Sequence, residues 1–280
     1  MIDGIQPKTF GRDKQAYCLM IFGWTKPVDS SIQTFVENLF AKLGSKPMIG
    51  TGHSNDANSH GSYNRVKRRI FGFLDNKGIS GEFGFRIRSE NLENLINFFP
   101  CDVEFVANKS SNHPKQAQIS VSDELISSPP YLVDLFMEDL LQEFGEFCGG
   151  CWSFPSQFGP AAYLSSLGTI PNGVNWGANR AYSNRITRYR DNVWKKGITP
   201  SSGYFREIYP INFLLLTHLN MPFRNKALSN YIESHGELIE IKNSKTMFRW
   251  NLTTDMLINV RHDLENSGLI ISSETEPLSM

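Results

Sequence analysis

Hydrophobic residues in the first half of the chain follow two spacings, one continuous and one periodic. The run YCLMIF (17–22) is unbroken and stops at Gly23, which is typical of a buried strand. Over residues 30–44 the apolar positions recur every three or four residues and end at a glycine, which predicts an amphipathic helix. A second helix is expected over residues 89–99, where a proline closes the pattern.

A polar stretch rich in glycine, serine and asparagine, residues 50–64, interrupts this pattern, and we expect a surface loop there. Segments 68–75 and 78–88 flank the turn DNKG, which predicts a hairpin. Further strands are expected at 101–107 and 116–122. The resulting order is strand, helix, strand, strand, helix, strand, which is the split βαβ order of ferredoxin-like folds. The predicted class is therefore α+β, with helices on one face of an antiparallel sheet.

The second half begins with a helix expected over residues 129–147, whose first turn contains two prolines. The chain is then irregular to about residue 175. A smaller α+β unit follows, with a helix at 226–234, a hairpin at 237–250, a helix at 254–268 and a strand at 269–272. We divide the chain into an α+β sheet unit (1–125), a helical and irregular connecting region (126–200) and a C-terminal unit (201–280). The alternative is that all three pack as one domain.

Composition narrows the class of protein. The chain has 280 residues, of which 40% are hydrophobic and 20% charged, as in an ordinary globular protein. Lysine plus arginine equals aspartate plus glutamate at 28 each, so the basic excess typical of nucleic-acid binders is missing. The first residues have no apolar core of signal-peptide length, and the run INFLLL is too short to cross a bilayer. We expect a cytoplasmic protein that does not enter the membrane.

The pair Cys148 and Cys151 in EFCGGCWSF raises the question of redox, zinc or haem chemistry. Haem attachment requires a histidine where Trp152 stands, and a zinc site requires two more ligands at matching spacing. A redox pair sits at a helix N-terminus, but here a helix precedes the pair. We expect Gly149 and Gly150 to end that helix in a turn, with the cysteines as small buried side chains. No metal and no cofactor are predicted.

His53, Asp56 and His60 lie in the polar stretch and offer the alternative of an enzyme with a metal-assisted site. The nucleophile elbow G-x-S-x-G is missing around Ser54, and no H-x-x-x-H helix accompanies the histidines. A surface loop without catalytic groups is the preferred interpretation.

Charge is distributed unevenly along the chain. Residues 122–147 carry seven acids and no lysine or arginine, and two acidic pairs at i, i+4 spacing destabilise the expected helix. Residues 180–196 are basic and contain tyrosine and tryptophan. Three interpretations are open: the two blocks pack on each other, the acidic helix docks into a basic groove, or the basic block contacts nucleic acid. The docking candidates are Asp134, Glu138, Asp139, Glu143 and Glu146, and the nucleic-acid candidates are Arg185, Arg188, Arg190 and Trp194.

The segment from Tyr204 to Ile241, with its YPINFL and LSNYI motifs, is followed by a strand ending in Trp250 and by VRHDLENSGLI. This last quarter resembles bacterial immunity proteins of polymorphic-toxin and type VI secretion systems. The resemblance implies a non-enzymatic protein that binds a cognate toxin and blocks its active site. Where that toxin is a nuclease its cleft is basic, and the acidic helix of residues 131–147 becomes the docking element.

Overall fold

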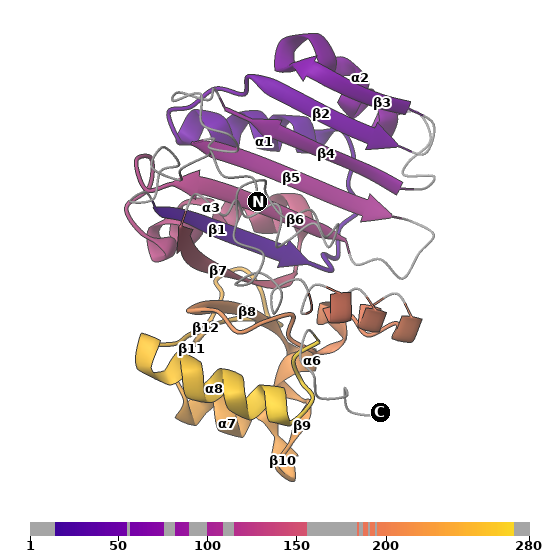
Figure 1. Cartoon of the computed structure of the whole chain (residues 1–280). Coiled ribbons are helices and arrows are strands. Elements are labelled where there is room, and N and C mark those ends of the chain that lie inside the picture. Colours follow the sequence, from indigo (N-terminus) through magenta and orange to yellow (C-terminus); the bar gives the residue numbers. More distant parts are fainter. Residues whose placement is uncertain are drawn as a thin grey trace, which may run out of the picture.

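A single antiparallel sheet forms the framework of the computed structural model, which describes residues 15–54, 57–75, 82–89, 100–108, 115–155, 184, 187–189, 191–193 and 195–271. The sheet has ten strands in the order β11-β12-β8-β7-β1-β6-β5-β4-β2-β3 (Figure 1). Its strands are β1 (Gln15–Phe22), β2 (Ile49–Ser54), β3 (Ala57–Ser62), β4 (Glu82–Arg88), β5 (Cys101–Asn108), β6 (Gln116–Ser122), β7 (Cys148–Pro155), β8 (Ile211–Leu215), β11 (Glu237–Glu240) and β12 (Met247–Asn251). The short strands β9 (Pro222–Phe223) and β10 (Lys226–Ala227) pair separately.

Helices cover the two faces of the sheet at different ends. Three helices cover one face: α1 (Ser31–Lys42), α2 (Tyr63–Asp75) and α3 (Pro129–Phe144). Apolar side chains of β1, β4, β5 and β6 pack against them. On the opposite face, Trp250 of β12 packs with residues of α7 (Leu228–Ser234) and α8 (Thr254–Asn266). Because side chains alternate along a strand, β8 and β12 contribute to both cores. The C-terminal part also contains the short helix α6 (Leu216–Leu219), labelled in Figure 1, and the 3₁₀ helix η3 (Pro200–Ser202).

The α+β class is confirmed, as are β1, α1, β5 and β6 within the first half. The C-terminal order is also confirmed for α7, the β11–β12 hairpin and α8, whereas the expected last strand is one parallel bridge between Ile270 and Phe205. The sheet continues from β7 into β8, so residues after 201 share it with the first 125. The three domain boundaries stay a prediction.

Two assignments between residues 50 and 75 were wrong, although the expected order of strand, helix, strand, strand, helix, strand is still present in β1, α1, β2, β3, α2 and β4. The expected loop is the hairpin β2–β3, and the expected strand at 68–75 belongs to α2. Glycines made β2 look like a loop, but they allow α2 to approach the sheet: a Cβ on Gly52 would lie 2.8 Å from Ile70 Cγ1. The DNKG turn and the helix expected at 89–99 lie largely outside the described residues.

The turn expected at CGGC was also wrong, because these residues form the start of β7. Helix α3 ends earlier, at Phe144, where Gly145 takes a left-handed φ of 71°. The expected burial of the cysteines is confirmed, since Cys148 and Cys151 are free and buried. Burial raises the pKa of Cys148 to about 12 and also raises the pKa of Cys151, so both thiols stay protonated at neutral pH.

Candidate interaction surface

Helix α3 is fixed on the sheet by its apolar face. Its first turn contains Pro129 and Pro130, and the Ser128 side chain caps it by accepting a hydrogen bond from the Tyr131 N–H at 3.4 Å. The buried face is formed by leucine, valine and phenylalanine at helical spacing, which sets the direction of the polar face: Leu132, Val133, Phe136, Leu140 and Phe144. The acidic side chains therefore lie on the flanks of the helix and on its outer surface.

The flank toward α1 holds two of the predicted acids in contacts within the chain. Asp139 forms an ion pair with Lys42, and the Glu143 carboxylate accepts hydrogen bonds from Ser31 Oγ at 2.8 and 3.0 Å. Glu143 is half-buried, and burial raises its pKa. These two acids tie α3 to α1.

Beyond the end of α3, Glu146 binds the turn between β11 and β12. Its Oε1 atom accepts a hydrogen bond from Ser244 Oγ at 2.7 Å, and hydrogen bonds from Thr246 and Ser244 lower its pKa. This acid thus connects the first half of the chain to the C-terminal hairpin.

The outer surface of α3 carries a stripe that we call the α3 ridge, formed by Tyr131, Asp134, Glu138 and Gln142. These residues recur at i, i+3, i+7 and i+11, and all four are exposed, Tyr131 at 52% and the Asp134 side chain at 66%. Within the described part of the chain, Glu138 has no ion-pair or hydrogen-bond partner. Sequence reasoning missed Tyr131, although its position three residues before Asp134 placed it on the same stripe.

Asp134 also begins a chain of polar contacts that leads to the edge of the sheet. Arg249 of β12, whose side chain is 18% exposed, donates from Nη1 to Asp134 Oδ1 at 2.8 Å. Its Nε donates to Asn251 Oδ1 at 2.8 Å, and Asn251 Nδ2 donates to Glu237 Oε2 at 3.1 Å. One half-buried arginine thus binds the Asp134 carboxylate on α3 directly and is connected to the Glu237 carboxylate on β11 through Asn251.

Most of the basic segment 180–196, the alternative candidate for a nucleic-acid contact, lies outside the described residues, including Arg185, Arg190 and Trp194. Arg188 is described and is partly buried. Among the described residues, the cations that form ion pairs with α3 are Lys42 of α1 and Arg249 of β12.

The histidines of the enzyme alternative lie on the β2–β3 hairpin, whereas Asp56 lies outside the described residues. His60 Nδ1 is 2.9 Å from Thr51 Oγ1. Across the ranges that the structure describes, no three histidine, cysteine, aspartate or glutamate side chains are grouped so that they could hold a metal ion.

The opposite face of the sheet contains a polar cluster that sequence reasoning did not identify. Arg86 of β4 binds the buried Asp102 of β5 through two nitrogens, and Glu104 of β5 lies between Arg86 and Gln118 in the strand register. Burial raises the pKa of Glu104 to about 7, against the opposing effect of Arg86. Gln118 is 3% exposed, and in the described part neither its amide atoms nor Glu104 Oε2 has a hydrogen-bond partner. The sequence signal for this cluster was the alternation of charged and apolar residues in EFGFRIR and CDVEFVA, which places the charged side chains on one face of the sheet.

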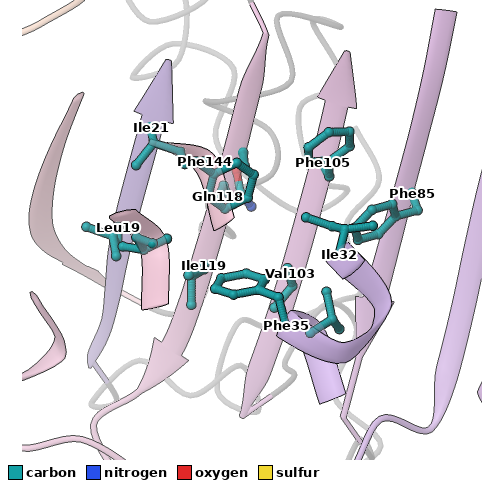
Figure 2. A pocket seen from close by; sticks show the side chains of 13 residues that line it. Leu19, Ile21, Ile32, Phe35, Phe85, Val103, Phe105, Gln118, Ile119 and Phe144 are labelled. Carbon is teal, nitrogen blue, oxygen red and sulfur yellow. The ribbon is translucent and has the colours of Figure 1, made fainter. Parts of the chain in front are cut away.

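A small cavity lies on the other side of these strands, between the sheet and helices α1 and α3. Figure 2 shows side chains of both layers around it, among them Ile32 and Phe35 of α1, Phe144 of α3, and Phe85 and Phe105 of the sheet. Its lining surface is apolar. We assign it to the packing of the core.

No protein-family model matches the chain, and no curated protein matches it. Among solved structures, the chain is similar to the T6SS protein PA0821 of Pseudomonas aeruginosa, with a TM-score of 0.50 and 10% sequence identity over 95% of this chain and 77% of that one. A likeness at this identity shows the fold, which the chain shares with a T6SS-associated protein. In the described ranges, none of the helices has the length and apolar character needed to span a bilayer.

Proposed function

We propose that this chain is a non-enzymatic binding protein of the immunity type, which occludes a cognate toxin in the cytoplasm. Two lines of evidence support the proposal. The fold is similar to that of a T6SS protein over nearly the whole chain, and the last quarter resembles immunity proteins in sequence. The α3 ridge then supplies a surface of suitable chemistry.

The observation that carries the proposal is the exposure of Tyr131, Asp134 and Glu138 along one helix that has no lysine or arginine. Exposed acids on the outer surface of a helix attract a basic cleft and speed up its association. Tyrosine is among the residues that contribute most to binding when a partner covers them. A toxin with a basic active-site cleft, such as a nuclease, fits this surface.

The best candidates among the five acids are those that a partner can reach without breaking an existing contact. Glu138 meets this condition fully, and Asp134 shares Arg249 with Asn251 while staying 66% exposed. Asp139, Glu143 and Glu146 are already engaged with α1 and with the β11–β12 turn. We therefore assign the α3 ridge as the docking element and the other three acids as internal contacts.

The test compares two matched double variants on the same helix. Asp134→Asn with Glu138→Gln removes two charges from the α3 ridge, and Asp139→Asn with Glu143→Gln removes two from the flank toward α1. Titration calorimetry against the product of the adjacent gene should show the ridge variant bind at least about tenfold more weakly, with the flank variant close to wild type. Equal affinity of the wild type and the ridge variant would exclude the ridge as the docking element.

A further inference from the structure

Among the strands of the described residues, β11 ends the sheet and pairs on one side only, with β12. Three of its four residues are exposed, and Ile239 is exposed at 38% although it is a large apolar side chain. Open edges of this kind are sites where another chain can add a strand.

The register shows which backbone groups of β11 face the open side. Ile241 N–H donates to Met247 O at 3.2 Å, so residue 241 faces β12. Backbone direction alternates along an antiparallel strand, and Ile239 and Glu237 therefore also direct their N–H and C=O groups toward β12. Leu238 and Glu240 direct theirs away from β12, toward the open edge.

The open edge and the α3 ridge belong to one continuous surface. The contacts from Asp134 through Arg249 and Asn251 end on Glu237, the first residue of β11. Ile239 is the cross-strand neighbour of Arg249, so it lies beside this chain of contacts on the same face of the sheet. A molecule that covers the ridge therefore reaches β11 without a gap.

We propose that β11 is a strand-addition site, at which an extended basic segment of the toxin pairs with the outward backbone groups of Leu238 and Glu240. This inference rests on the proposed function and adds a second element to the docking surface. Backbone pairing provides affinity, and Glu237, Glu240 and the ridge acids select a positively charged segment.

The charges on β11 also distinguish between the possible occupants. Pairing of two β11 strands from two copies would place one glutamate from each copy on each face of the strand pair, and like charges across a strand pair are destabilising. A basic segment neutralises the same glutamates. The toxin segment is therefore the favoured occupant, and self-pairing is the alternative that the experiment must detect.

The experiment removes one outward N–H without disturbing β12. Proline at an edge position whose N–H faces outward is tolerated by the sheet but prevents strand addition. Glu240→Pro therefore tests the site, and Glu240→Ala is the matched control, since it loses the same charge and keeps the N–H. The probe is the purified product of the adjacent gene, titrated into each variant.

We expect Glu240→Pro to bind about tenfold more weakly than Glu240→Ala, with both variants showing the melting temperature of the wild type. In the wild-type complex, hydrogen exchange at the amides of Leu238 and Glu240 should become slow. Equal binding of the two variants with fast exchange at both amides would overturn the inference while leaving the proposed function intact.

Two further outcomes are decisive. A chain that is dimeric in solution and becomes monomeric with Glu240→Pro would overturn the inference in favour of self-pairing. Absence of any binding by the wild type would instead contradict the proposed function itself, and the strand-addition site with it.

Discussion

Replacement of Glu104 by glutamine should change how stability depends on pH. Glu104 lies between Arg86 and Gln118 in the polar cluster on the sheet face opposite α1, α2 and α3. Burial raises its pKa to about 7 from an ordinary value of 4.5. In the unfolded chain the carboxyl loses its proton near the ordinary value, whereas in the folded chain it keeps the proton to about pH 7. Between these two values the folded state binds more protons, so the free energy of unfolding falls as pH rises.

The size of the effect follows from the two pKa values. Each pKa unit corresponds to about 1.4 kcal/mol, so the gap between 4.5 and about 7 corresponds to about 3 kcal/mol. Glu104→Gln has no proton to lose. The stability of the variant relative to the wild type should therefore rise by about 3 kcal/mol between pH 4.5 and pH 8.

The assay is urea unfolding of the two proteins at several pH values. The difference between their free energies of unfolding reports on Glu104 alone. Buried His218, whose pKa burial lowers to about 4, makes stability rise with pH, but it does so equally in both proteins. The exposed substitution Glu138→Gln controls for the chemical change itself. A difference between Glu104→Gln and the wild type that is the same at pH 4.5 and pH 8 would refute the reasoning.

Three other predictions follow from buried groups. Gly150→Ala should destabilise the fold by about 1–3 kcal/mol in urea, because a Cβ there would clash with the ring of Tyr209 and lie 2.9 Å from a carbonyl oxygen of β8. Gly72→Ala on α2 is the control, since a Cβ there meets nothing within 4 Å and alanine favours a helix, so stability should stay equal or rise by up to about 1 kcal/mol. Cys148 should resist thiol reagents in the folded protein and react with them on unfolding, because it is buried and burial raises its pKa to about 12. Rapid labelling of Cys148 in the folded chain would contradict this prediction. The buried His218 side chain should stay neutral down to about pH 4, whereas the histidine of the unfolded chain gains a proton near pH 6.5, so the free energy of unfolding should fall as pH falls from 6.5 toward 4. The variant His218→Gln should lack this loss of stability. The same dependence of stability on pH in the variant and the wild type would argue against the prediction.

Local periodicity explains how far the fold could be predicted. Helices α1 and α8 and the β11–β12 hairpin carry their pattern within their own residues, and all three were found. Strand β2 was missed because Gly50 and Gly52, which let α2 pack closely, read as loop residues without their neighbour. The partner that explains a glycine is distant in the sequence, so no local pattern could supply it.

The candidate surface shows the same limit. Charge spacing placed five acids on or just beyond one helix, but four of them contact Ser31, Lys42, Ser244 or Arg249, each about a hundred residues away in the sequence. Periodicity could have separated the outer stripe from the flanks. It could not show that the flanks were already occupied.

Protection of a host cell tests the central claim most directly. The product of the adjacent gene would be expressed in a bacterial host together with the wild-type chain, the ridge variant or the flank variant, and growth would be followed. We predict that the wild type and the flank variant restore growth and that the ridge variant, present at the same level, does not. Growth arrest that persists with the wild-type chain would contradict the account.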